Sequence, residues 1–398
     1  MGNGWDKIFA PDVVTISVSL NDMSGIYIHI PFCRKACTYC NFHFSTNLIR
    51  RSEMLDCILA ELEQRCDFLE EKTVRSIYLG GGTPSVLGER ELERLFSKIY
   101  DLFEVDADSE ITLESNPDDL NRDYLKMLSE TPVNRLSIGI QCLDEEYLRW
   151  MNRSHNLHQA ISSVENALEL GFNKLTADLI FGLPHRKSAD LLSDLEQFKN
   201  WGLRHFSAYA LTVEPKTVLD HQIKTGKMQP LHEEASAQQF ELLMGWAENN
   251  QYEQYEISNF AKNGCRAVHN SSYWKGLKYL GCGPSAHSFD GEKRYWNISN
   301  NALYMKSIEN GQLPLEMENL SPKDRYNEYV LTGLRLIEGI SLERALELYP
   351  GAEKELKSTV EYFLKLGYMK IRDGGNYALS RQGKLMADYI SSEMMVVE

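Results

Sequence analysis

The chain has 398 residues, 43% of them hydrophobic and 10% aromatic, which is typical of a globular protein with a main domain and a smaller one. Its formal net charge of −15 argues against nucleic acid as the main partner, because phosphate binding needs a basic surface. The sequence has neither a secretory signal nor an apolar run of the roughly 18 residues that a membrane span needs, so we expect a cytoplasmic protein without a transmembrane segment.

Strand-like and helix-like segments alternate along most of the chain. Residues 1–22 lack this alternation, and we expect them to be an N-terminal extension, with Met23 as the alternative start. Strands are predicted at 25–31, 74–79, 110–114, 135–141, 175–181 and 204–212 from their alternating or apolar β-branched residues. Helices are predicted at 51–71, 88–103, 119–130, 144–151, 157–170, 188–201 and 232–249 from apolar residues at helical spacing.

This alternation predicts an α/β fold. Repeated strand–helix units form a parallel sheet, and six of them make a partial TIM-like (β/α)6 barrel rather than a closed barrel, which needs eight. We assign the barrel to residues 23–250 and a connecting region rich in Tyr, Trp, Gly and His to residues 251–320. Residues 321–398 predict a mainly α, winged-helix-like domain with a hairpin turn at Gly374 and Gly375.

Three cysteines come directly after the first predicted strand. Cys33, Cys37 and Cys40 fall within eight residues, and the other five cysteines are scattered and predict buried thiols. Three soft thiolates on one loop suit a [4Fe–4S] cluster, whose fourth iron would stay open to bind S-adenosylmethionine (SAM). A zinc site with His43 as fourth ligand and three unrelated thiols are the alternatives. The glycine-rich turn after the second strand favours the cluster.

Further polar groups end other strands, where the reactive groups of such folds lie. Gly80, Gly81, Gly82 and Thr83 permit close approach of a ligand to the backbone, although a tight turn would also explain them. Glu114 suits ribose hydroxyls, although an ordinary surface charge would also explain a glutamate at this position. Arg153 and Asp178 suit carboxylate and amine groups, and a helix cap or surface pair would explain each of them as well.

Seven ordered motifs extend this interpretation: GIYIHIPFCRKACTYCNF, GGGTPS, LESNP, NRLSIGIQ, DLIFGLP, YALTVEP and HNSSYW. Together they resemble the oxygen-independent coproporphyrinogen III oxidase-like (HemN-like) family of radical SAM proteins, from about Gly25 to the C-terminus. The resemblance implies a [4Fe–4S] cluster on the three cysteines. It also implies that SAM contacts Tyr27, Tyr39, Gly81, Gly82, Thr83, Glu114, Gln141, Arg153 and Asp178.

Two branches of this family differ at positions that the sequence shows. The oxidases resembled here carry a further cysteine two residues after the third ligand, where this chain has Phe42, and a longer N-terminal region. The HNxxYW pattern from His269 to Trp274 is similar to the haem chaperone branch. The resemblance therefore implies a protein that binds haem and transfers it to acceptor haemoproteins, without coproporphyrinogen oxidase activity and with SAM cleavage left open. The oxidase itself or another radical SAM activity is the alternative.

The haem-binding residues would come from the same motif. His269 is a candidate axial ligand because imidazole commonly ligates haem, and Tyr273 and Trp274 offer flat faces to a porphyrin. A histidine packed in an aromatic core is the alternative, and His287 and Cys282 compete as ligands, whereas His29 is expected to be structural. The resemblance also leaves room for peripheral contact with membrane-bound acceptors and for a cluster-dependent homodimer.

Overall fold

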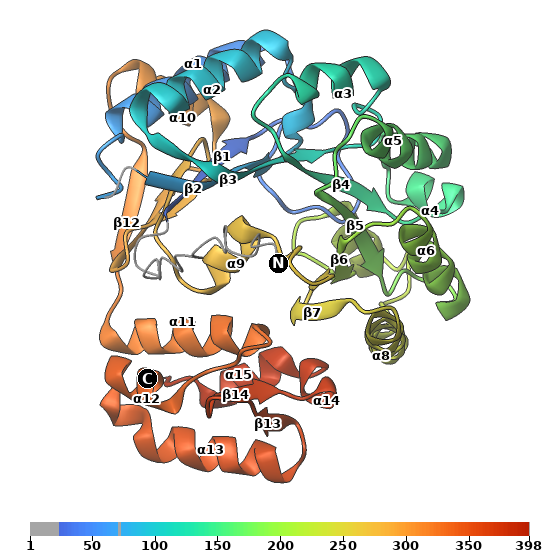
Figure 1. Ribbon diagram of the computed structural model, residues 1–398, viewed down its shortest axis with the longest axis vertical. Coiled ribbons are helices and arrows are strands. Elements are labelled where there is room, and N and C mark those ends of the chain that lie inside the picture. The colour runs from blue at the N-terminus through green and yellow to red at the C-terminus, as the bar shows by residue number, and fades with distance from the viewer. Residues whose placement is uncertain (1–23, 71–72, 398) are drawn as a thin grey trace, which may run out of the picture.

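A computed structural model describes residues 24–70 and 73–397 of the chain. These residues form one twelve-stranded sheet with helices along its outer face, and a mainly helical C-terminal part lies against its open side (Figure 1). The expected extension at residues 1–22 and the alternative start at Met23 lie outside the described residues.

Parallel strands form the middle of the sheet, in the order β9-β1-β2-β3-β4-β5-β6. They span Ser24–Ile30 (β1), Thr73–Gly81 (β2), Glu104–Ser115 (β3), Arg135–Gln141 (β4), Leu175–Phe181 (β5), His205–Ala210 (β6) and Tyr279–Cys282 (β9). The first six confirm the strands predicted from the sequence. Between the described strands at the two ends of the sheet, β12 and β7, no pairing closes the barrel, which confirms the open, partial form.

Helices cover the outer face of these strands because each presents one apolar stripe. In α2, for example, Leu92, Leu95, Phe96 and Ile99 are buried at helical spacing. The helices span Arg51–Gln64 (α1), Pro84–Val86 (η2), Glu89–Leu102 (α2), Arg122–Ser129 (α3), Glu145–Trp150 (α4), Leu157–Glu169 (α5), Ser188–Asn200 (α6), Val218–Lys224 (α7) and Glu233–Asn249 (α8).

The first helix is shorter than its apolar pattern predicts. It ends at Gln64 instead of residue 71, and the next residue, Arg65, is buried. The Arg65 guanidinium donates to the Gly281 carbonyl at 2.8 Å and to Ser288 Oγ at 2.9 Å. A long-range contact of this kind is invisible to local periodicity.

Residues 251–320 extend both ends of the sheet. One end gains β8 (Asn259–Ala261) and β7 (Glu253–Glu256), and the other gains β10 (His287–Phe289), β11 (Lys293–Asn297) and β12 (Leu315–Asn319). The same stretch contains α9 (Val268–Trp274) and α10 (Asn301–Glu309). Strands of three to five residues carry too little periodicity to be predicted, and the domain limits proposed from the sequence stay predictions.

The C-terminal part has its own apolar core, which includes Tyr326, Val330, Leu356, Phe363 and Ile390. Its elements are α11 (Pro322–Arg335), α12 (Leu342–Leu348), η3 (Pro350–Ala352), α13 (Glu353–Lys365), β13 (Met369–Ile371), β14 (Tyr377–Leu379), α14 (Arg381–Lys384) and α15 (Ala387–Met394). Three helices followed by a hairpin agree with the predicted winged-helix-like arrangement. No helix among the described residues combines the length and apolar character that crossing a bilayer requires.

Candidate functional site

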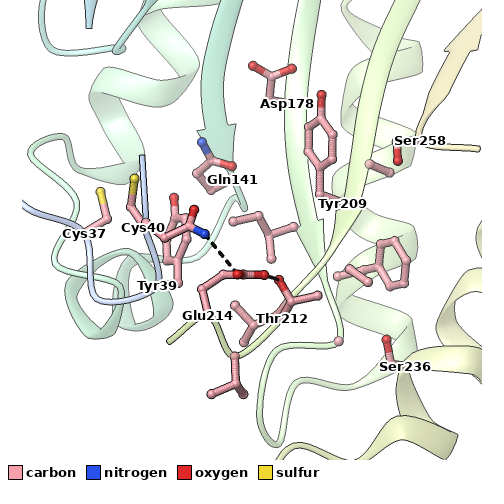
Figure 2. A pocket seen from close by; sticks show the side chains of 18 of the residues that line it. Cys37, Tyr39, Cys40, Gln141, Asp178, Tyr209, Thr212, Glu214, Ser236 and Ser258 are labelled. Atoms are coloured by element: carbon pink, nitrogen blue, oxygen red, sulfur yellow. Dashed lines mark hydrogen bonds between the residues drawn. The ribbon is translucent and has the colours of Figure 1, made fainter. Parts of the chain in front are cut away.

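A cavity of about 1390 Å³ lies at the carboxyl ends of the parallel strands (Figure 2). The three cysteines and all but one of the expected SAM-contacting residues line it, namely Cys33, Cys37, Cys40, Tyr39, Gly81, Gly82, Thr83, Glu114, Gln141, Arg153 and Asp178. Tyr27, His269, Tyr273 and Trp274 do not line it. The volume exceeds the 300–1,000 Å³ usual for a small-molecule site, so the cavity has room for more than one ligand.

Hydrogen bonds connect two of the cysteine thiols to Thr83, just after β2, and to Arg153, in the loop between α4 and α5. Thr83 Oγ1 donates to Cys33 Sγ at 3.3 Å, and Arg153 Nη1 donates to Cys37 Sγ at 3.3 Å. Asn116 joins these donors, since its amide nitrogen donates to Thr83 Oγ1 at 3.3 Å and its oxygen accepts from Arg153 Nη2 at 2.6 Å. The network fixes both thiols relative to the sheet, and sequence reasoning gave Asn116 no such role.

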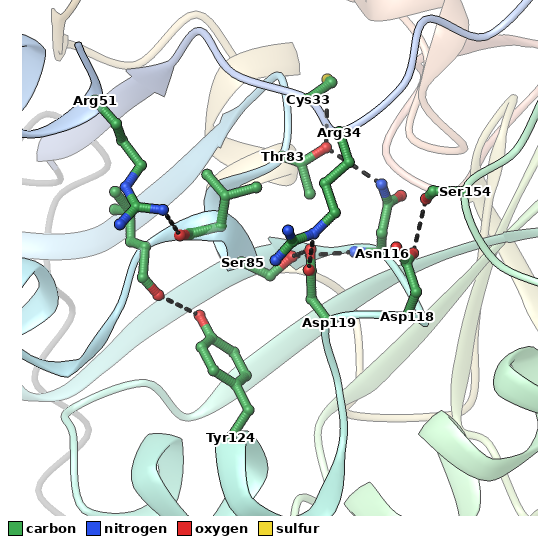
Figure 3. Close-up of polar contacts among 12 residues, drawn as sticks. Cys33, Arg34, Arg51, Thr83, Ser85, Asn116, Asp118, Asp119, Tyr124 and Ser154 are labelled. Atoms are coloured by element: carbon green, nitrogen blue, oxygen red, sulfur yellow. Dashed lines mark hydrogen bonds and ion pairs between the residues drawn. The ribbon is translucent and has the colours of Figure 1, made fainter. Parts of the chain in front are cut away.

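The outer side of the cysteine loop is held by Asp119, which is 5% exposed (Figure 3). Its carboxylate accepts from Arg34 Nε at 2.6 Å and from Ser85 Oγ at 2.7 Å. Asn152 adds a side-chain bond of 2.7 Å to the Ala36 carbonyl. Sequence reasoning missed these anchors, although the position of Asp119 just after the LESNP motif is a signal that could have found it.

A third anchor comes from the segment after β6. Asn41 Nδ2 donates to Glu214 Oε2 at 2.9 Å, and Thr212 Oγ1 donates to Glu214 Oε1 at 3.1 Å (Figure 2). The backbone N–H of Leu219 also donates to the Thr38 carbonyl at 2.9 Å. Thr212 and Glu214 belong to the YALTVEP motif, whose contact with the cysteine loop sequence spacing did not predict.

The donor set fits an iron–sulfur cluster better than zinc. All eight cysteines are free, and three thiols of one loop face one cavity. A cubane needs thiolates at separate corners, and Cys33, Cys37 and Cys40 supply three of them to this cavity, which His43 does not line. His43, the candidate fourth zinc ligand, has its Nε2 2.7 Å from Asn301 Oδ1. Burial raises the pKa of the Cys33 thiol to about 12, so binding a cluster there releases a proton.

The glycine-rich turn meets the cysteine segment closely. Gly81 has a φ of +104°, and a Cβ on it would lie 2.6 Å from the His29 ring. A Cβ on Gly82 would lie 2.6 Å from the Phe32 carbonyl oxygen. The positive φ at Gly81 and the close approach of neighbouring atoms at both positions leave no room for a Cβ, which explains why both residues are glycine. Gln141, at the end of β4, also has a left-handed φ of 68°, a conformation that is uncommon for non-glycine residues and frequent at functional sites.

Two carboxyl groups project from neighbouring parts of the sheet into the barrel. Glu114 accepts from Tyr78 Oη at 2.5 Å and from the Gly81 backbone N–H at 3.2 Å, and Asp178 accepts from Ser137 Oγ at 3.1 Å. Burial raises the pKa of Glu114 to about 7 and that of Asp178 to about 6. The site therefore favours a ligand that brings positive charge or hydrogen-bond donors.

These raised pKa values predict a pH dependence of stability. A carboxyl group with a higher pKa in the folded chain contributes fully below its unfolded pKa, and that contribution is lost as the pH rises through the folded value. For Glu114 and Asp178 the window runs from about 4 to about 7. We expect the urea midpoint of the ligand-free protein to fall across this window, and to fall less in Glu114→Gln. Parallel declines in the two proteins would contradict the expectation.

Tyr27, on β1, is the expected SAM-contacting residue that does not line the cavity. Its ring stacks on Tyr78 with centroids 6.1 Å apart, and its hydroxyl lies 3.1 Å from His29 Nδ1. His29 Nε2 lies 2.9 Å from the His43 carbonyl, so both its nitrogens have protein partners, as a structural role requires. Burial lowers the pKa of His29 to about 4, which keeps the ring neutral.

The HNxxYW motif forms α9 and lies at the opposite end of the barrel. His269 contacts Ser76 near the amino end of β2, with Nδ1 2.9 Å from the Ser76 hydroxyl. Tyr273 is 46% exposed, and Trp274 stacks under the Arg335 guanidinium at 4.7 Å. Within the motif, His269 and Trp274 therefore pack against other parts of the protein, whereas Tyr273 is open to solvent.

The two competing haem ligands differ in accessibility. Cys282 is 0% exposed in β9, where it belongs to the main apolar core and pairs with Ile28 of β1. His287 is exposed at the start of β10, beside the Trp296 ring at 6.3 Å. A porphyrin iron would reach His287 without rearrangement of the core but would not reach Cys282.

Comparison with known proteins gives the family of the chain. Residues 27–198 match the model of the Radical SAM superfamily. The chain is 34% identical over 375 residues to the heme chaperone HemW of Bacillus subtilis, covering 92% of this chain and 98% of the relative. It is 33% identical to the heme chaperone HemW of Lactococcus lactis, covering 82% and 85%.

A solved structure shows the same fold. Coproporphyrinogen III oxidase (HemN) from Escherichia coli, described as a radical SAM enzyme, superimposes with a TM-score of 0.80 and 21% identity, covering 95% of this chain and 91% of the other. The fold likeness spans both the barrel and the C-terminal part. By its sequence relatives and its fold, the chain belongs to the HemW family of the radical SAM superfamily.

Proposed function

We propose that this protein is a haem chaperone that carries a [4Fe–4S] cluster with SAM, binds haem and passes it to acceptor haemoproteins. The observation that carries the proposal is the 34% identity to a heme chaperone over nearly the full length of both chains. We place its work in the cytoplasm, because clustered free thiols suit a reducing compartment. A homodimer and contact with membrane-bound acceptors stay predictions of the sequence resemblance.

In this proposal Cys33, Cys37 and Cys40 hold the cluster, which when bound would supply an open iron for SAM and one electron for its cleavage. Thr83 and Arg153 hold two of the thiols through the bonds described above. The other expected SAM contacts are Tyr27, Tyr39, Gly81, Gly82, Gln141 and Asp178. Glu114 accepts the ribose hydroxyls, because its carboxylate reaches the cavity with its remaining lone pairs.

Haem is proposed to bind at the HNxxYW helix. Ser76 engages Nδ1 of His269, so Nε2 is the ring nitrogen left for an iron. A hydrogen bond to the second nitrogen is the usual way in which a protein orients a ligating histidine. Tyr273 and Trp274 would supply the flat apolar contacts.

Haem titration separates the proposed chaperone from an oxidase. Protein reconstituted with iron and sulfide under anaerobic conditions should bind haem stoichiometrically and leave coproporphyrinogen III unchanged. Formation of protoporphyrinogen would instead establish oxidative decarboxylation, the activity of the solved structural relative. Phe42, 69% exposed beside the cavity, stands where the oxidases carry a further cysteine and favours the chaperone.

Replacement of His269 tests the haem ligand. We expect His269→Ala to weaken haem binding about tenfold or more, since a loss of 1.4 kcal/mol is already tenfold. The absorbance of the iron–sulfur cluster should stay unchanged. His158→Ala, which removes an exposed imidazole from α5, is the control and should bind haem as the unaltered protein does. Equal affinities of all three proteins would remove His269 as the ligand.

A further inference from the structure

One aromatic contact joins the HNxxYW helix to the cavity. The His269 ring stacks on Tyr78 with centroids 5.0 Å apart and planes inclined by 25°. The hydroxyl of the same tyrosine donates to Glu114 Oε1 at 2.5 Å. Glu114 lines the cavity and His269 does not, so Tyr78 connects this histidine to the cavity lining, while Trp274 of the same helix reaches the lining separately through Arg335.

His269 is itself held from several sides. Its Nδ1 lies 2.9 Å from Ser76 Oγ, and its backbone N–H donates to Glu110 Oε1 at 3.0 Å. A Cβ on Gly25 would lie 3.4 Å from the ring, which places the imidazole against β1 as well. These contacts therefore hold the His269 ring in place against one face of the Tyr78 ring.

We propose that His269 is a positioning residue for Glu114, acting through Tyr78, and so sets how well the site distinguishes ribose from deoxyribose. This inference rests on the proposed function, in which Glu114 accepts the ribose hydroxyls. Tyr78 stacks on Tyr27 as well as on His269, so both neighbours restrict the ring. Removing one of them lets the phenol move, and Glu114 then loses its strongest donor.

The expected effect is on selectivity more than on overall affinity. Binding groups must be held within about 0.5 Å of the productive geometry by the residues behind them. A displaced Glu114 would still lie in the cavity, but its carboxylate would accept a weaker hydrogen bond from the 2′-hydroxyl of the ribose. A purely structural role for His269 would weaken every ligand equally and leave the selectivity unchanged.

Calorimetric titrations of the anaerobically reconstituted protein with S-adenosylhomocysteine and with its 2′-deoxy analogue test the proposal. The ratio of the two Kd values measures recognition of the 2′-hydroxyl. We expect His269→Ala and Tyr78→Phe to lower this ratio about fivefold or more, a loss of roughly 1 kcal/mol. His269→Phe should keep most of the ratio, because a flat ring still stacks on Tyr78. His158→Ala is the matched control.

The outcomes separate the inference from the proposed function. An unchanged ratio in His269→Ala, with a reduced ratio in Glu114→Gln, overturns the positioning role alone. An unchanged ratio in Glu114→Gln overturns the ribose assignment and the inference with it. If His269→Ala does not fold, His269→Asn replaces it. A reduced ratio in His269→Asn with a retained ratio in His269→Phe supports the proposal, and equal ratios in the two overturn it.

Discussion

Replacing any one of Cys33, Cys37 and Cys40 with alanine is expected to remove the cluster, from about four iron atoms per chain to fewer than about one. Each thiol would ligate a separate corner, and no spare cysteine of this chain lines the cavity to take its place. Loss of one ligand leaves two open irons, which exposes the cluster to solvent and oxidation. Iron and sulfide analysis of anaerobically reconstituted protein measures the result.

Two cysteines elsewhere provide the control. Cys66 and Cys265 are free and partly exposed but do not line the cavity. Alanine at either position should leave the iron and sulfide content unchanged. Retention of the full cluster in all three loop variants, or zinc in place of iron, would refute the assignment. Because that assignment carries the proposed function, its failure would remove the basis for SAM binding as well.

Glu61→Ala is expected to lower the free energy of unfolding by about 3–5 kcal/mol, the usual result of removing one partner of a buried ion pair. Glu61 is 0% exposed, and it accepts from Arg65 Nη1 at 3.0 Å, Asn297 Nδ2 at 2.8 Å and Tyr304 Oη at 2.6 Å. It also accepts from the Gly283 backbone N–H at 2.8 Å. Its removal leaves the buried Arg65 cation without its counter-ion, and leaves the Tyr304 hydroxyl and the Gly283 N–H without the acceptor that they have in the folded chain.

The expected decrease in the free energy of unfolding is large because Glu61 connects separate parts of the fold. It lies on α1, and its partners belong to β11, α10 and the turn after β9. Urea unfolding of the ligand-free protein measures the change. The control is Glu63→Ala on the same helix, whose side chain is 66% exposed and pairs with Lys98. Surface pairs contribute about 1 kcal/mol or less, so a similar loss in both variants would contradict the prediction.

Most of the barrel was predictable because its strands and helices have local sequence patterns. β1 to β6 carry apolar or alternating residues over six or more positions, and amphipathic helices come after most of them. The strands at the ends of the sheet were not predictable. β8 and β10 have three residues each and owe their existence to neighbouring strands that offer free backbone groups.

The candidate site also contains residues that the sequence predicted and residues that it did not. The cysteines and the polar residues at strand ends could be chosen from the sequence, since the carboxyl ends of parallel strands meet at one edge. The anchors Asp119 and Glu214 could not. Their bonds to Arg34 and Asn41 join residues separated by 85 and 173 positions, and no local pattern encodes such a contact.

The sequence by itself determined the ligand spacing of the cysteine loop, the family, and the order of strands that brings the polar residues to one rim, because these depend on neighbouring residues and on the geometry of parallel strands. The tertiary structure alone decided where the HNxxYW motif lies. His269 reaches Ser76 across 193 positions, at the end of the barrel away from the cysteines, because α9 returns to the barrel before β9 pairs with β1. Such placement depends on the packing of the whole sheet.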